Sequence, residues 1–93
     1  MDLIYSITIL SIMATCKLER RIDLRELSVK LKGFEYNNGA SWFGVFRNYH
    51  LNGKIEITVK GTIISLGTRK EEDAKADILY TIQRLQGLKG VFI

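Results

Sequence analysis

The stretch KIEITVKGTIISL, residues 54–66, shows most directly how this chain folds. Every second residue from Ile55 to Val59 is apolar and β-branched, and polar residues stand between them. Such alternation is typical of a strand with one buried and one solvated face. Gly61 interrupts the pattern, and the apolar-rich run Thr62–Leu66 follows it. The stretch therefore predicts two antiparallel strands joined by a short turn.

Three further runs extend the predicted sheet. Residues 41–47 are expected to form the next strand, joined to the central pair by a short turn at Asn52-Gly53, and Phe34–Tyr36 forms a short strand before it. Residues 3–15 are apolar enough for the core of a secretion signal, but Asp2 stands where basic residues belong and no cleavage pattern follows. We interpret residues 3–15 as the opening strand. No run reaches the roughly 18 to 20 apolar residues that a membrane span requires.

Two segments have helical spacing. Asp23 with Glu26 is the pattern of a capping box, and three leucines follow it at helical intervals. Thr68 with Glu71 is a second capping box, which begins a longer helix that ends at Gly87. The apolar stripe of this helix consists of Ala74, Ile78, Leu79, Ile82 and Leu85. The order β-α-β-β-β-β-α predicts a two-layer α+β fold, with an antiparallel sheet of about five strands and both helices on one face.

The composition is that of one small soluble domain over residues 1–93. The chain is 46% hydrophobic and 26% charged, with a mean hydropathy of +0.03, a composition that favours neither a disordered nor a fibrous protein. Because so short a chain buries only about two thirds of the surface that it exposes when unfolded, we expect a second copy or a partner to add stability. The net charge of +4 favours anionic partners.

Residues able to do chemistry do not form a catalytic group. His50, the only histidine, falls in an expected turn without a nucleophile beside it, and Cys16, the only cysteine, excludes an internal disulfide. Glu71, Glu72 and Asp73 are expected to complement the dipole of a helix first turn rather than to bind a metal. We predict a protein that is not an enzyme, has no metal or cofactor, is not associated with a membrane, and is intracellular, in the cytoplasm.

Aromatic residues are concentrated in one part of the chain. Six of the nine lie within residues 34–49, close to Arg47. Aromatic rings beside cations can stack on bases while the cations pair with phosphates. Core packing explains the same residues, since strand alternation would place Trp42 and Phe46 on one face and Phe43 on the other. Both interpretations are kept at this point.

Four segments in fixed order carry a resemblance to a known family. They are SIMAT at residues 11–15, IDLR at residues 22–25, FEYN at residues 34–37, and the stretch from Gly61 to the acidic residues 71–73. Together they resemble one repeat of the TATA-box-binding protein (TBP) family, which reads roughly NIVAT, LDLK, AEYNP and GKxVxTGAKSEE. The resemblance covers about residues 7–87. It implies a single TBP-like domain in which the sheet is curved.

The resemblance also implies how such a domain is used. Family members carry two repeats in one chain, and their sheets join into a saddle over the minor groove of DNA. This chain has one repeat, so we expect a homodimer with a symmetric interface between the opening strands. Single repeats of this fold also occur as appendages that grip RNA/DNA hybrids.

The residues that kink DNA differ from those of the family. Family members push phenylalanines between base steps, and an ungapped alignment places Ser41 and Thr58 at those two positions. A shift by one residue would bring Trp42 to the first position, but it would spoil the match of Arg47 to a phosphate-facing arginine. Glu56 replaces a groove-facing leucine. These replacements argue against recognition of a TATA sequence and against sharp kinking.

The remaining residues of the predicted concave face suggest a grip on nucleic acid. Threonine hydroxyls could approach the minor groove, and lysine and arginine side chains could pair with phosphates. The predicted nucleic-acid-binding residues are Ser11, Met13, Arg47, Thr58, Lys60, Thr62, Ile64 and Arg69. The sequence thus predicts a dimeric module that grips duplex DNA or an RNA/DNA hybrid with little kinking, with a role in transcription. The alternative is a protein–protein interaction module that has kept the fold and lost DNA binding, because the same face carries several apolar residues.

Overall fold

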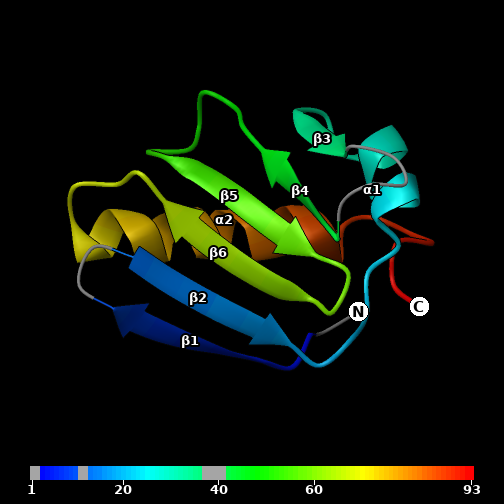
Figure 1. Cartoon of the computed structure of the whole chain (residues 1–93), viewed down its shortest axis with the longest axis horizontal. Coiled ribbons are helices and arrows are strands. Elements are labelled where there is room, and N and C mark those ends of the chain that lie inside the picture. The colour runs from blue at the N-terminus through cyan, green and yellow to red at the C-terminus, as the bar shows by residue number, and fades with distance from the viewer. Residues whose placement is uncertain (1–2, 11–12, 37–41) are drawn as a thin grey trace.

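The computed structural model describes residues 3–10, 13–36 and 42–93. Its strands and helices are, in chain order, β1 (Tyr5–Leu10), β2 (Met13–Leu18), α1 (Leu24–Lys30), β3 (Phe34–Tyr36), β4 (Phe43–Phe46), β5 (Lys54–Thr58), β6 (Thr62–Leu66) and α2 (Glu71–Gln86). The strands form one antiparallel sheet in the order β1-β2-β6-β5-β4-β3. In Figure 1, α2 crosses behind the sheet and α1 lies beside β3.

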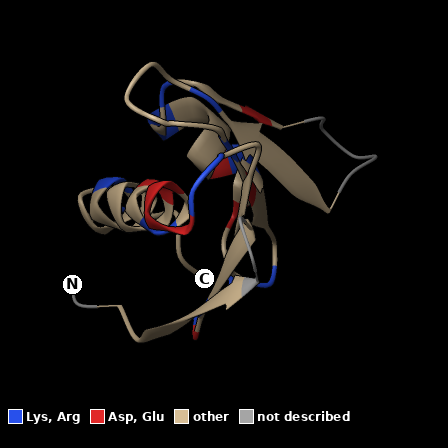
Figure 2. Ribbon diagram, turned by 90° about the vertical axis from the view of Figure 1, so that its left-hand side faces the viewer, with Lys and Arg blue, Asp and Glu red and all other residues tan. Residues whose placement is uncertain are grey.

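The sheet is curved, and α2 lies on one side of it (Figure 2). The α+β fold predicted from the sequence, an antiparallel sheet with two helices, is therefore confirmed. No helix in the described part of the chain is long and apolar enough to cross a membrane.

The opening segment differs from the sequence-based prediction. Instead of one strand over residues 3–15 it forms the hairpin β1–β2, in which Tyr5 lies opposite Leu18 and Leu10 lies opposite Met13. The described sheet consequently has six strands rather than about five. Turn chemistry gave no warning of this reversal, because the intervening Ser-Ile pair contains no Gly, Pro, Asn or Asp.

The core lies between the sheet and the two helices. Ile55 and Ile57 of β5 and Ile63 of β6 are fully buried, as their alternation predicts. The helices contribute buried residues to the same cluster, among them Leu27 of α1 and Ile78 of α2. Cys16 is buried in this cluster, and its burial raises the pKa of the thiol to about 11.

The two helix starts differ from each other. At α1, the Asp23 carboxylate accepts hydrogen bonds from the backbone N–H of Arg25 and Glu26, at 3.1 and 3.2 Å, so the first predicted cap is confirmed. At α2, the prediction of a cap at Thr68 is wrong. The cap position is Lys70, which makes no side-chain capping bond.

The buried face of α2 also differs from the predicted stripe. Leu79 is 42% exposed, whereas Asp77 and Thr81 are buried. The Asp77 carboxylate accepts hydrogen bonds from Asn52 N and Gly53 N at 2.9 Å, and from the Asn52 side-chain amide at 3.0 Å. Asn52-Gly53 is therefore not a two-residue hairpin turn. It is the end of a longer loop, residues 47–53, which α2 holds in place.

Candidate nucleic-acid interface

The face of the sheet that looks away from α2 is called the open face here, and it is turned toward the viewer in Figure 1. Strand register identifies its central row, because Thr15 lies opposite Ile64, Ile64 opposite Glu56, and Glu56 opposite Val45. The burial patterns agree, since these residues are half-buried while their neighbours along each strand are buried. Members of the open face are Ser6, Thr8, Met13, Thr15, Lys17, Thr62, Ile64, Leu66, Lys54, Glu56, Thr58, Phe43, Val45 and Glu35.

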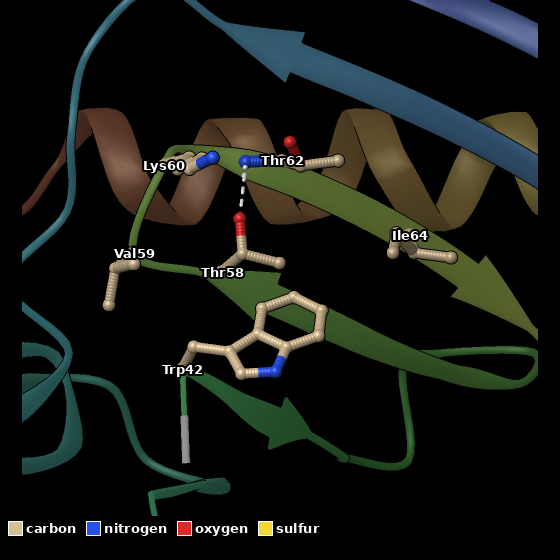
Figure 3. A pocket seen from close by; sticks show the side chains of 6 residues that line it. All are labelled: Trp42, Thr58, Val59, Lys60, Thr62 and Ile64. Atoms are coloured by element: carbon tan, nitrogen blue, oxygen red, sulfur yellow. Dashed lines mark hydrogen bonds between the residues drawn. The ribbon is translucent and has the colours of Figure 1, made fainter.

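Four of the predicted binding residues line one cavity on this face. The cavity has a volume of about 510 Å³, and Trp42 and Val59 complete its lining, as Figure 3 shows. The four residues are Thr58, Lys60, Thr62 and Ile64. The chain reverses sharply beside them at Gly61, whose φ is +91° and where a Cβ would collide with the carbonyl oxygen of Arg20. This reversal brings Lys60 to the rim of the cavity.

Thr58 has no exposed side chain that could insert between two base pairs. It is 4% exposed, and its hydroxyl oxygen accepts a hydrogen bond of 3.0 Å from Thr62 N. The exposed ring beside Thr58 is that of Trp42, the residue before β4. Trp42 is 63% exposed, and its ring packs edge-on against that of Phe43, with ring centroids 5.2 Å apart. Strand alternation would place Trp42 on the same face as Phe46, which is fully buried. Trp42 is exposed instead, because it precedes the first residue of β4 and lies outside the regular strand.

The other predicted residues lie elsewhere. Met13 begins β2 on the open face, and the register of β2 with β6 places it at the end of the sheet away from the cavity. Arg47 follows β4 and lines a different cavity, together with Lys32 and Tyr80. Arg69 is exposed in the segment between β6 and α2. Ser11 lies outside the described residues, as does Ser41, the other expected wedge position.

The strand register shows how far the cavity lies from the end of the sheet where Met13 and Arg47 lie. Phe43 lies opposite Thr58 at the cavity end of the β4–β5 pair, and Phe46 lies opposite Ile55 at the other end. Three residues of strand span roughly 10 Å. The predicted set therefore divides into one group at the cavity and single residues at the opposite end of the sheet.

Among the open-face residues missed from the sequence are two of β2. Thr15 lies opposite Ile64, and Lys17, which is exposed, lies opposite Thr62 beside the cavity. The signal that could have found them is the alternation that begins at Met13, which continues to the end of β2. The prediction ended its opening strand at residue 15 and so stopped before Lys17.

The open face is mixed in charge. Lys17 and Lys60 carry positive charge at the cavity end, and Lys54 at the other. Glu56 occupies the middle of the central row, between Val45 and Ile64. Among the residues that the structure describes, no three His, Cys, Asp or Glu side chains are grouped so as to hold a metal ion.

Comparison with known families agrees with this architecture. The sequence profile of the family described as transcription factor TFIID (or TATA-binding protein, TBP) matches residues 6–88. No curated protein and no solved structure matches the chain. The matched residues include all the described strands and helices except the first residue of β1, and they coincide with the resemblance found in the sequence motifs. The chain therefore belongs to the TATA-binding protein family, of which it contains a single TBP-like repeat.

Proposed function

We propose that this chain is a nucleic-acid-binding module whose open face grips duplex DNA or an RNA/DNA hybrid with little kinking. The observation that supports the proposal most strongly is the cavity beside Thr58, the position that the ungapped alignment assigns to a kinking phenylalanine of the family. There a threonine with a satisfied hydroxyl replaces a phenylalanine, and Lys60 and Lys17 stand beside it. Lysines suit a grip on the phosphate backbone, whereas a kink needs an apolar wedge, which Thr58 does not offer.

The proposed module is a homodimer joined through β1. This strand is the edge of the sheet, and its sequence YSITIL contains no charge and no proline. Natural proteins usually protect such an edge, because its free N–H and C=O groups can pair with another strand. β2 is not available for this role, since it pairs with β1 on one side and β6 on the other. The opposite edge strand, β3, has only three residues.

The hydrogen-bond pattern indicates which groups of β1 face outward. The carbonyl of Ile4 accepts a hydrogen bond of 3.1 Å from Glu19 N, so Ile4 belongs to a hydrogen-bonded pair. Because such pairs alternate in an antiparallel ladder, the N–H groups of Tyr5, Ile7 and Ile9 point away from β2. Two copies of β1 could pair through these groups around a twofold axis.

The dimer is tested by two variants of one residue. Ile7→Pro removes an outward N–H, and Ile7→Ala, its control, shortens the side chain even more but keeps the N–H. Sedimentation of the full chain at high micromolar concentration should give the dimer mass for the parent and Ile7→Ala, and the monomer mass for Ile7→Pro. A parent protein that sediments only as a monomer would remove the dimer.

The grip is tested by fluorescence anisotropy with an A·T-rich duplex, a G·C-rich duplex and an RNA/DNA hybrid at several salt concentrations. Lys60→Ala should weaken binding and lower the salt slope by about one unit per subunit. Lys75→Ala, which removes the same charge from an exposed position of α2, should leave the slope unchanged. Absence of binding near 50 mM salt, or equal effects of the two variants, would retire the proposal. A large bend in a doubly labelled duplex would retire the claim of little kinking.

A second candidate function is protein–protein interaction through the same face. Half-buried apolar residues support it: Met13, Phe43, Val45, Ile64 and Leu66 all lie on the open face. Such a patch suits an apolar partner. Binding to an apolar protein surface would depend little on salt and little on Lys60, so the same titrations distinguish the two functions.

The family description names a transcription factor. We extend that role to this chain as part of the proposal, together with a non-enzymatic mode of action and an intracellular location. A buried reduced thiol at Cys16 suits such a location.

A further inference from the structure

We propose that a second site, separate from the open face, binds the phosphate and the ring of a nucleoside phosphate. This site, called the basic cleft, has a volume of about 410 Å³ and lies between the segment after α1, the 47–53 loop and the C-terminal half of α2. Its cations are Lys32, Arg47 and Arg84, and its rings are Tyr49, His50 and Tyr80. The inference does not depend on the open-face grip, because Lys60 and Trp42 line a different cavity.

The charge of the cleft is of one sign. Three cations line it, and no Asp or Glu does. A salt bridge joins Lys30 to Glu26, and within the described ranges no carboxylate forms a salt bridge with Lys32, Arg47 or Arg84. Gathered cations without partners repel one another, so an anion bound among them gains from all three. A phosphate group is the ligand that suits guanidinium and ammonium donors best.

The backbone holds two of these cations side by side. Arg47 N donates a hydrogen bond of 3.0 Å to the carbonyl of Gly33, next to Lys32. Gly33 has a φ of +95°, and a Cβ there would collide with the carbonyl oxygen of Arg47. Only glycine permits this approach of the two segments. The close approach of the backbone of Gly33 to that of Arg47 is thus a fixed feature of the fold, and it places Lys32 and Arg47 at the same cleft.

The rings form a ladder from solvent into the core. Tyr49 is 91% exposed. The centroid of its ring lies 4.4 Å from that of the His50 ring, and the His50 centroid lies 5.6 Å from that of the Tyr80 ring. Tyr80 in turn stacks on the buried Phe46, with centroids 6.3 Å apart and an interplanar angle of 4°. An exposed ring at the outer end of a supported ladder is a platform on which a base can stack.

The loop that carries the outer rings is held in shape from two directions. The Asn48 amide donates to the Tyr80 hydroxyl at 3.0 Å, and its oxygen accepts from His50 N at 2.9 Å. At the other end of the loop, Asp77 holds Asn52 and Gly53. A binding loop fixed before the ligand arrives loses less entropy on binding.

Cations and rings together define the ligand class. Rings give no advantage to a bare phosphate ion, and an uncharged ring compound gains no charge pairing from the three cations. A nucleoside phosphate supplies both halves, and a cleft of this volume falls in the range of small-molecule sites. Two sources share this chemistry: a free nucleotide, and the phosphorylated end of a single nucleic-acid strand.

The single histidine makes the test simple. His50 lines the cleft and is the only histidine of the chain, so its imidazole signals in NMR spectra need no assignment. Adenosine 5′-monophosphate, added to the full chain at millimolar concentrations, should shift them in a saturable way. Adenosine alone and inorganic phosphate alone should each bind about tenfold or more weakly, since each offers one half of the ligand.

Variants locate the binding. Arg84→Gln should weaken the binding of adenosine 5′-monophosphate about tenfold, the usual scale for loss of a charge-assisted contact. The matched control is Arg21→Gln, because Arg21 is exposed and lies outside the cleft. Tyr49→Ala should weaken the nucleotide but not inorganic phosphate, and because the side chain is 91% exposed the fold should be unaffected. Lys60→Ala should leave the His50 shifts unchanged even if it abolishes the duplex grip.

A hexanucleotide with and without a 5′-phosphate separates the two sources. Tighter binding of the phosphorylated hexamer than of the mononucleotide assigns the cleft to strand ends, and the reverse order assigns it to free nucleotides. The inference is overturned if no probe shifts the His50 signals, if inorganic phosphate binds as well as the nucleotide, or if Arg21→Gln has the same effect as Arg84→Gln.

Discussion

The two faces of the sheet are built from alternate residues of the same strands, yet they differ in almost every property. On β5, Ile55 and Ile57 are fully buried against the helices, while Glu56 between them faces solvent on the open face. On β6, Ile63 is fully buried and Ile64 lines the cavity. Successive side chains of a strand point in opposite directions. Substitutions one residue apart should therefore separate stability from recognition.

The largest expected effect of such a separation is at Phe46. This side chain is fully buried and stacks on Tyr80, so Phe46→Ala should cost about 3 to 5 kcal/mol in the free energy of unfolding. Val45→Ala, the control one residue earlier on the half-buried open face, should cost about 1 kcal/mol or less. Urea denaturation of both variants measures the difference. Equal losses would show that the open face is part of the core, for example in a dimer that covers it.

The next largest effect is expected at Asp77, a polar residue on the buried side. Its carboxylate accepts hydrogen bonds from Asn52 and Gly53, so Asp77→Ala leaves these partly buried donors without their charged acceptor, at a cost of about 1 to 3 kcal/mol. Denaturation should show the loss, and hydrogen exchange should show that residues 47–53 open more often. Asp73→Ala, in the first turn of the same helix, is the control and should cost only about 0.3 to 1 kcal/mol through the helix dipole. Similar costs would mean that Asp77 does not hold the loop.

Periodic features of the fold were readable from the sequence for a physical reason. The burial of Ile55, Ile57 and Ile63 follows from alternation along a strand, and the Asp23 cap follows from the local reach of a short carboxylate. Such features depend on residues within a few positions of one another. Each of them can therefore be predicted without reference to the rest of the chain.

What the sequence did not reveal depends on distant partners. The antiparallel pairing of β1 with β2 brings Tyr5 opposite Leu18, and no residue typical of turns marks it in the sequence between Leu10 and Met13. The burial of Asp77 makes sense only once Asn52 and Gly53 lie beside it. The same limit applies to the site: Thr58, Lys60, Thr62 and Ile64 could be grouped from strand register, whereas the place of Arg47 in the basic cleft requires its contact with Gly33.

A smaller effect is expected from Cys16, on the buried face of β2. Burial raises the pKa of this thiol to about 11 from 9.0, so the folded state keeps the proton at pH values where the unfolded state loses it. Stability is therefore fully present below about pH 9 and falls as the pH rises toward 11, by at most about 1.4 kcal/mol per pH unit. The difference between parent and Cys16→Ala, measured by denaturation at pH 8 and pH 10.5, isolates this contribution. A difference that does not change with pH would contradict the burial of the thiol.

The smallest effect on stability, and the most informative for function, is expected at Glu56. This residue lies on the open face between Val45 and Ile64, and Glu56→Gln should change the free energy of unfolding by about 0.5 kcal/mol or less. If nucleic acid lies across the open face, loss of this negative charge should tighten binding about two- to fivefold at low salt, because charge repulsion at a partly exposed site is of the order of 1 kcal/mol. Glu72→Gln on α2 is the control for net charge.

The sign of the Glu56 effect distinguishes the two functions proposed for the open face. A phosphate backbone is repelled by Glu56, so its removal strengthens binding, whereas a basic protein partner is attracted by Glu56, so its removal weakens binding. An apolar partner would respond little to either variant. Because the substitution alters one residue at the centre of the face and leaves the buried side untouched, the sign of the change in anisotropy midpoint identifies the chemistry of whatever lies on the open face.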